Sequence, residues 1–162
     1  AVLGDAPDAA HQHPTSPVVR RRIDAIWSVF AERDVSPVAA IACEAWEVDE
    51  GYDAARQLID SGVQFDAIVC LNDRIAVSAY RALREAHIRI PEDVSVVSFD
   101  DAEFAQSLDP PLTTLALPLP DMAALAVQLV TTDNHDAREH LVTMPLRERG
   151  SVRRAHTNTT EA

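Results

Sequence analysis

The stretch Ala67-Ile68-Val69-Cys70-Leu71 is an uninterrupted apolar run of strand length, and Asn72-Asp73 follow it directly. Asn and Asp are preferred at the position that caps the start of a helix. A helix should follow, because apolar residues then recur at three- to four-residue spacing, at Ile75, Ala79, Leu83 and Ala86. The stretch therefore predicts a buried strand, a polar turn and an amphipathic helix.

The same kind of unit recurs along the chain. Strand-length apolar runs that end in a polar turn occur at 1–3, 38–43, 67–71 and 94–99. Helical spacing occupies 19–30 and 52–59, and Gly62 is placed to end the second of these helices. Continuous apolar runs are typical of strands that are buried on both faces of a parallel sheet. We therefore expect an α/β fold, with a Rossmann-like parallel sheet flanked by helices and right-handed crossovers.

The rhythm changes after Asp109-Pro110-Pro111. The pattern predicts an extended segment over 112–117, a short amphipathic helix with Met122, Leu125 and Leu129, and a last strand over 141–146. The polar tail 151–162 is expected to be disordered.

Composition excludes several classes of function. The chain has 26 acidic and 14 basic residues, for a net charge of −12, and none of the basic residues is Lys. A Walker phosphate loop and a Schiff-base mechanism both need Lys, and wrapping nucleic acid needs clustered positive charge. The apolar runs are shorter than the roughly 20 residues of a membrane span, so no membrane partner is expected. Cys43 and Cys70 each end an apolar run, which favours buried free thiols and a cytoplasmic location.

Ligands of open parallel sheets bind outside the carboxyl ends of the strands. This rule selects six residues: Asp5, Trp46, Asn72, Asp73, Asp100 and Asp101. Such a set suits a neutral ligand rich in hydroxyl groups, which donate to carboxylates while an apolar face lies on an indole ring. Two alternatives stay open: Asp73 and Asp101 could be helix caps or Asx turns, and Trp46 could simply cover the sheet edge.

An enzyme is not indicated. The chain has no Gly-x-Ser-x-Gly, His-Glu-x-x-His or Gly-x-Gly-x-x-Gly motif. The Asp100-Asp101 pair could hold Mg²⁺, as in a phosphotransfer enzyme, but such enzymes normally place a Lys near the phosphoryl group. The histidines do not converge on metal-ligand spacing. We therefore expect no catalytic residues, no metal and no cofactor.

Three blocks, in the correct order and spacing, closely resemble the effector-binding region of LacI/GalR-type transcriptional repressors. They are FDAIVCLNDRIA at 65–76, IPEDVSVVSFDD at 90–101 and PPLTTL at 110–115. Weaker similarity covers 46–55, the helix that contains Arg22, and 146–151, so that the resemblance extends over most of the chain.

The resemblance implies a periplasmic-binding-protein-like fold of two Rossmann-like lobes with an effector in the cleft between them. Residues 1–111 would form most of the C-terminal lobe. Residues 112–132 would be a return crossing and a helix of the other lobe, with an exposed apolar face around Met122, Leu125 and Leu129, and 133–150 would return to the C-terminal lobe. The helix-turn-helix, the hinge and most of the N-terminal lobe would lie outside this chain.

The resemblance also implies roles for individual residues. Asp100 matches an aspartate that contacts the effector, Asn72 a cleft amide, Trp46 an aromatic that stacks on the ligand, and Arg22 an arginine at a cleft-facing helix end. Asp73, Asp101 and Asp5 would support these residues. Homodimer contacts would come from Tyr52, Ala55, Leu58, Ile59, Ala79, Leu83, Phe104 and Leu108. His87 and Ser98 stand where the family usually has Gly, so His87 is expected to need a positive φ.

The sequence thus supports two hypotheses of function. The first is the effector-sensing and dimerising portion of a DNA-binding transcriptional regulator, whose small-molecule effector is a sugar or a similar metabolite and whose operator DNA is read only by a part outside this chain. The alternative is a sugar-binding protein of a transport system, which shares the fold but works outside the cytoplasm.

Overall fold

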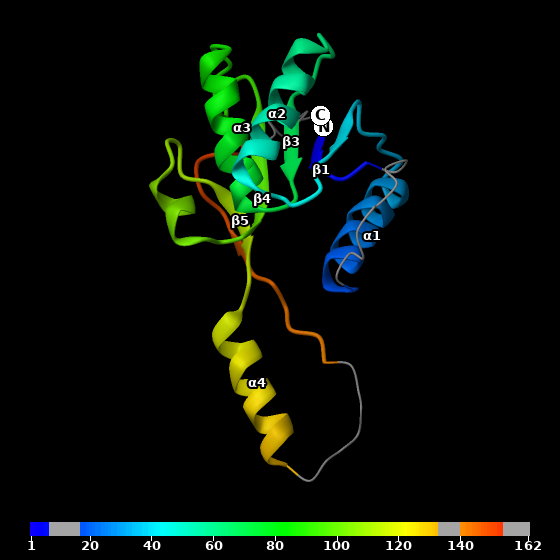
Figure 1. Cartoon of the computed structure of the whole chain (residues 1–162), viewed down its shortest axis with the longest axis vertical. Helices are drawn as coiled ribbons and strands as arrows, with labels where there is room; N and C mark the ends of the chain where they lie inside the picture. Colours follow the sequence, from blue (N-terminus) through cyan, green and yellow to red (C-terminus); the bar gives the residue numbers. More distant parts are fainter. Residues whose placement is uncertain (7–16, 133–139, 154–162) are drawn as a thin grey trace, which may run out of the picture.

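A six-stranded sheet with the strand order β2-β1-β3-β4-β5-β6 forms the centre of the computed structural model, which describes residues 1–6, 17–132 and 140–153 (Figure 1). The first five strands are parallel, as predicted for the first four, and β6 is antiparallel to β5. Their bounds are β1 Val2–Gly4, β2 Ala40–Ala42, β3 Ala67–Cys70, β4 Ser95–Asp100, β5 Thr113–Ala116 and β6 Leu146–Arg147. The α/β fold expected from the sequence is confirmed.

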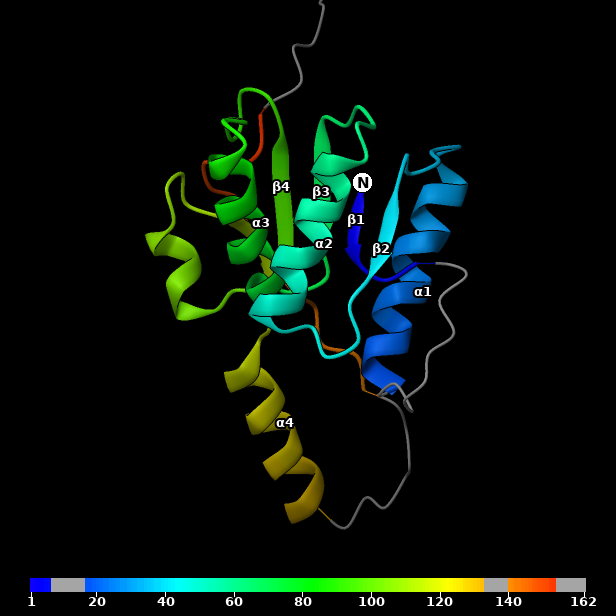
Figure 2. The ribbon, with the colours of Figure 1, turned by 45° about the horizontal axis from the view of Figure 1, so that its top comes forward.

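In the described part of the chain, four α-helices and one 3₁₀ helix accompany the sheet. They are α1 Pro17–Glu32, α2 Val48–Asp60, α3 Asp73–Glu85, η1 Glu103–Ser107 and α4 Leu119–Thr131. Helices α2 and α3 lie side by side and cover one face of the sheet, and α1 lies beside β1 and β2 (Figure 2). The chain runs outward from β1 to β2 and then back to β3, so right-handed crossovers require α1 and α2 to lie on opposite faces.

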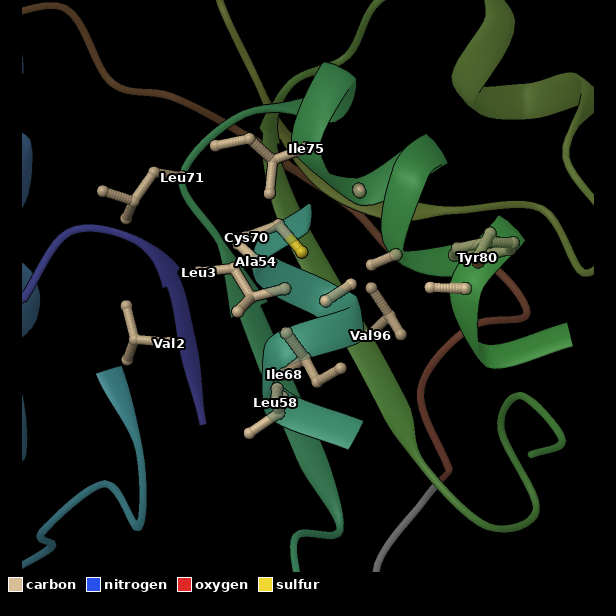
Figure 3. Close-up of a cluster of buried hydrophobic side chains, with 14 of the residues drawn as sticks. Val2, Leu3, Ala54, Leu58, Ile68, Cys70, Leu71, Ile75, Tyr80 and Val96 are labelled. Carbon is tan, nitrogen blue, oxygen red and sulfur yellow. The ribbon is translucent and has the colours of Figure 1, made fainter. Parts of the chain in front are cut away.

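The core lies between the sheet and the α2–α3 pair (Figure 3). Leu3, Ile68 and Val96 from three neighbouring strands meet Leu58 from α2 and Ile75 from α3, and all five side chains are buried. The apolar runs of the sequence therefore do form the strands of a sheet interior.

The two cysteines are free and buried, as predicted. Burial, together with the nearby Glu50 carboxylate, raises the pKa of the Cys43 thiol to about 12. Burial also raises the pKa of Cys70. Both groups are therefore protonated side chains of the core at neutral pH.

Local signals set the ends of the helices. The Asn72 side chain caps α3, since its Oδ1 accepts a hydrogen bond from the Ile75 amide at 2.9 Å. Gly62 follows α2 with a φ of +70°, a conformation that costs little for glycine. His87 follows α3 with a φ of +59°, as the sequence predicts.

Helix α4 points away from the sheet, beyond the edge at which the strands end (Figure 1). It has no buried residue, and Met122 and Leu129 are 43% and 36% exposed. The exposed apolar face expected on this helix is therefore present. The assignment of 112–132 to a second lobe stays a prediction, and residues 133–139 of the predicted final segment lie outside the described residues.

The sequence analysis expected a disordered tail to begin directly after Gly150, and this boundary is wrong. Ser151 is completely buried, and its hydroxyl donates to the Val96 carbonyl at 2.6 Å and accepts from the Thr113 amide at 2.8 Å. A single serine thus joins β4 to β5. The chain is held again at Arg153, whose amide donates to the Ser95 hydroxyl at 3.2 Å. Residues 154–162 of the predicted tail lie outside the described residues.

The last strand is also shorter than predicted. It is observed at Leu146–Arg147, at the end of the expected segment 141–146. Pro145 immediately before it has no amide hydrogen to give to a strand ladder, although its carbonyl accepts from the Ala116 amide at 2.9 Å.

The buried serine gives a direct test of the corrected boundary. Replacing Ser151 by Ala leaves the Thr113 amide and the Val96 carbonyl without their side-chain partner, and we expect the free energy of unfolding to fall by about 1–3 kcal/mol. Urea denaturation measures the change. Ser28→Ala, at an exposed serine of α1, is the matched control and is expected to stay within about 0.5 kcal/mol of the original protein. An equally small effect at Ser151 would contradict the assignment.

Candidate functional site

The predicted site residues gather at the carboxyl edge of the sheet, where strand order reverses. Because β1 connects outward to β2 while β3 lies on its other side, the helices leave β1 and β3 in opposite directions, and ligands of open parallel sheets bind at such a point. Gly4 ends β1, Leu71 follows β3 and Asp100 ends β4. Arg22 reaches this edge from α1.

An ion pair occupies the centre of the edge. Arg22 Nη2 lies 3.0 Å from Asp100 Oδ1, and Arg22 Nη1 donates to the Leu71 carbonyl at 2.9 Å. The Arg22 side chain is 12% exposed and that of Asp100 is 31% exposed. The arginine is thus held from two strands, whereas the carboxylate keeps surface open to a ligand.

Two aromatic rings flank the guanidinium. Arg22 Cζ lies 4.9 Å from the centroid of the Phe99 ring and 6.0 Å from that of Trp46, distances at which a cation is attracted to the face of an aromatic ring. The Trp46 indole N–H donates to the Gly4 carbonyl at 2.9 Å. Its polar edge is therefore already bonded, and the apolar ring surface is what Trp46 offers to a ligand.

Asn72 links this aromatic to helix α3. Its Nδ2 donates to the Trp46 carbonyl at 2.9 Å, while its Oδ1 caps the helix. An amide has a second hydrogen and a second lone pair, so Asn72 can still bond a ligand. The structure therefore brings Arg22, Trp46, Asn72 and Asp100 together, as predicted from the strand ends and from the family resemblance.

The other three candidates are bonded within the fold. Asp5 is 3% exposed and accepts from the Trp27 indole N–H at 3.1 Å. Asp73 is 1% exposed and faces the sheet interior. Asp101 pairs with Arg149 at 2.7 Å and with Arg147 at 3.5 Å. Their expected role in supporting the site stays a prediction.

The two neighbouring carboxylates Asp100 and Asp101 bond different arginines, so they do not converge on a shared position. No group of three or more His, Cys, Asp or Glu side chains within residues 1–6, 17–132 and 140–153 could hold a metal ion. No helix in those ranges is long and apolar enough to cross a membrane.

Backbone strain concentrates at this edge. Trp46, Asp100 and Asp101 have φ values of +56°, +107° and +56°, which side chains other than glycine rarely adopt. Each such residue costs about 1–3 kcal/mol and persists only where its surroundings hold it. Strain of this kind is characteristic of binding sites, and here it falls on two of the four residues predicted to contact a ligand.

Burial shifts the titration of the central carboxyl group. Burial raises the pKa of Asp100 above its usual value, and the Arg22 guanidinium counteracts part of that increase. Because the pKa is higher in the folded state, Asp100 favours folding most at low pH, and this contribution is lost as the pH rises through the folded pKa.

The predicted dimer residues divide into two groups. Four of them are at most 1% exposed because they pack α2 and α3 onto the sheet: Ala55, Leu58, Ala79 and Leu83. These four have no surface with which to contact a second chain. This part of the predicted set is corrected. Tyr52, Ile59, Phe104 and Leu108 keep exposed surface. Tyr52 and Leu108 line an open groove on the outer side of α2 and α3, together with Val48, Val77, Tyr80, Arg81, Ile88 and Ile90.

Sequence reasoning missed two aromatic residues of the site. Phe99 was assigned only to a strand and Trp27 only to an apolar helix face, yet the first lies against Arg22 and the second donates to Asp5. The position of Phe99 immediately before Asp100, at the end of a strand, is the signal that could have identified it.

The ion pair yields a prediction about titration. Replacing Arg22 by Met removes the positive charge beside Asp100, so the pKa of Asp100 should rise further. A ¹³C-NMR titration of the carboxyl groups measures it. Arg20→Met, at an exposed position of the same helix, is the control and should leave the pKa of Asp100 unchanged. An Asp100 pKa that is the same in both variants would show that the pair does not form in solution.

Comparisons with known proteins agree with this geometry. The family model of the periplasmic binding protein-like domain matches residues 1–152. The lactose operon repressor of Rhizobium radiobacter is 40% identical over 99 residues, which are 60% of this chain and 87% of that protein. The ribose operon repressor of Escherichia coli is 34% identical over 111 residues, or 66% of this chain and 34% of that protein.

Among solved structures, a putative LacI-family transcriptional regulator from Sanguibacter keddieii matches with a TM-score of 0.78 and 26% identity. The match covers 93% of this chain and 58% of that one. The chain thus spans about a third of the length of the ribose operon repressor and somewhat more than half of this solved relative. The chain belongs to the family of the periplasmic binding protein-like domain, in the form that LacI-family transcriptional regulators carry.

Proposed function

We propose that this chain is the effector-sensing and dimerising portion of a cytoplasmic DNA-binding transcriptional regulator, and that it is not an enzyme. The observation that carries the proposal is the Arg22–Asp100 pair between the rings of Phe99 and Trp46, at the reversal of strand order. The relatives named as operon repressors support a regulator rather than a transport protein. Operator DNA would be bound by a part of the regulator outside this chain.

The chemistry of the site favours a sugar or a similar polyhydroxylated metabolite. Asp100 accepts from hydroxyl groups, Arg22 and Asn72 donate to oxygen, and the ring of Trp46 can lie on an apolar sugar face. A hydrogen bond to a charged group contributes about 1.5–3 kcal/mol, so about three of them reach the roughly 8 kcal/mol of micromolar affinity. The site has no lysine and only one arginine at its centre, which makes a phosphorylated ligand a poorer fit.

Effector binding would regulate through a population shift. A ligand held between Asp100 and the residues facing it stabilises one of two arrangements of the regulator, and the affinity for operator DNA then changes by linkage. The strained turn at Asp100 suits this role, because it keeps the carboxylate in place before the ligand arrives.

The effector site is tested by calorimetric titration of the regulator that contains this chain, with D-ribose and with lactose. Asp100→Asn removes one charge-assisted hydrogen bond, so we expect at least about tenfold weaker binding of the sugar that the original protein binds. Asp24→Asn, at an exposed position of α1, is the matched control and should leave the affinity unchanged. Unaltered affinity in Asp100→Asn would remove Asp100 from the site.

We further propose that the outer face of α2 and α3 forms a homodimer. Exposed surface of Tyr52 and Leu108 borders the groove there, with apolar Val77 and Ile88 beside the arginines Arg81 and Arg84. The acids Asp49 and Asp53 line the same groove, so that a second copy related by twofold symmetry would bring opposite charges together.

Sedimentation velocity over a range of concentrations tests this face. Leu108→Arg places a charge at the groove and is expected to shift the protein from dimer to monomer. Val63→Arg, at an exposed valine that does not line the groove, is the control and should leave the dimer intact. Identical behaviour of the two variants, or a monomeric original protein, would refute the proposed interface.

A further inference from the structure

The buried carboxylate of Asp73 joins three elements and a turn of the fold. Asp73 is the first residue of α3. Its Oδ1 accepts from the Ser98 hydroxyl of β4 at 2.7 Å and from the Thr114 hydroxyl of β5 at 2.9 Å. Its Oδ2 accepts from the Ala102 amide at 2.7 Å. Helix α3, two strands and the segment that follows β4 therefore meet at one carboxylate.

This carboxylate is compensated where it lies. A buried charge is costly unless it is hydrogen-bonded, and Asp73 has three donors as well as a place in the first turn of α3, where the helix dipole favours negative charge. Ser98 and Thr114 are completely buried, so their hydroxyls cannot turn to water instead. The network therefore has one well-determined arrangement.

The bond to Ala102 acts on the strained turn of the site. Ala102 follows Asp100 and Asp101, the two consecutive residues with positive φ. On the near side of the turn, the Leu117 amide donates to the Asp100 carbonyl at 3.1 Å. On the far side, Asp73 holds the Ala102 amide. The φ of Asp100 sets the direction in which its side chain leaves the backbone, and in this structure that direction leads to Arg22.

We propose that Asp73 is a positioning residue: by fixing the Ala102 amide it keeps the turn in its left-handed conformation and aims the Asp100 carboxylate at Arg22. It does not touch the ligand. The geometric part of this inference stands on the structure alone, and its consequence for effector binding rests on the proposed function.

Asp73→Asn is the informative change, because it nearly preserves the size of the side chain. An amide oxygen can still accept from Ser98 and Thr114, but the amide nitrogen then faces the Ala102 amide, donor against donor. We expect Asp100 and Asp101 to leave their positive-φ conformation, which shifts their one-bond Cα–Hα coupling constants in NMR spectra. Asp34 and His87 also have positive φ but do not contact Asp73, so their couplings should stay the same. Unchanged couplings at Asp100 and Asp101 would overturn the proposal.

A double-mutant cycle on sugar affinity separates positioning from general stability. With D-ribose or lactose as the probe, Asp73→Asn should weaken binding about tenfold in the original protein but less than about twofold in the Asp100→Asn background. Equal losses in both backgrounds would show that Asp73 acts through overall stability and not through Asp100. If neither sugar binds the original protein, the sugar proposal fails, and the NMR measurement still decides the role of Asp73.

Thr114→Val is the milder second variant should Asp73→Asn fail to fold. It removes one of the two hydroxyl donors that orient the Asp73 carboxylate, so the carboxylate remains but holds the Ala102 amide less firmly. We expect smaller coupling shifts of the same sign at Asp100 and Asp101. Coupling constants identical to those of the original protein would contradict the proposed network.

Discussion

The parallel alignment of β1, β3, β4 and β5 is the constraint on which the site depends. Parallel strands end at the same edge, so residues that are nearly one hundred positions apart in the sequence, Gly4 and Asp100, belong to one rim. The reversal of strand order at β1 marks the point of this rim that Arg22 reaches from α1, where its guanidinium donates to the Leu71 carbonyl. The polar cluster is therefore a direct consequence of the topology.

Close packing at this edge leaves little freedom to the backbone. Gly4 has a φ of +120°, and a Cβ at this position would lie 2.8 Å from the Leu71 side chain, so only glycine fits between β1 and β3. The carbonyl oxygen of Gly4 also accepts a hydrogen bond from the Trp46 indole N–H. The position of the aromatic ring thus depends on a glycine that the core packing requires.

The sequence was sufficient for the five parallel strands, the four α-helices and most of the rim, because these follow from local signals. Apolar runs predicted the parallel strands, and the polar residue after each run predicted Asn72 and Asp100. Interactions between distant segments were not predictable in the same way. Ser151 makes a hydrogen bond to Val96, which is 55 positions away in the sequence. Trp27 makes one to Asp5, which is 22 positions away, and the helical spacing around Trp27 does not indicate this partner. Such contacts depend on how elements stack, and neither periodicity nor turn residues carry that information.

The polar pair that follows β3 and the pair at the end of β4 show how the surroundings give adjacent side chains different roles. In Asn72-Asp73, the Asn72 amide donates to the Trp46 carbonyl at the rim. The Asp73 carboxylate is buried and accepts from the Ser98 and Thr114 hydroxyls of β4 and β5. In Asp100-Asp101, the first carboxylate faces Arg22 and the second bonds Arg149. Each pair therefore has one member that is open to a ligand and one that is bonded within the fold. A group that contacts a ligand must keep hydrogen-bond donors or acceptors that are not already used within the protein. Its neighbour in each pair uses its own hydrogen bonds within the fold, and this holds the ligand-contacting residue in position.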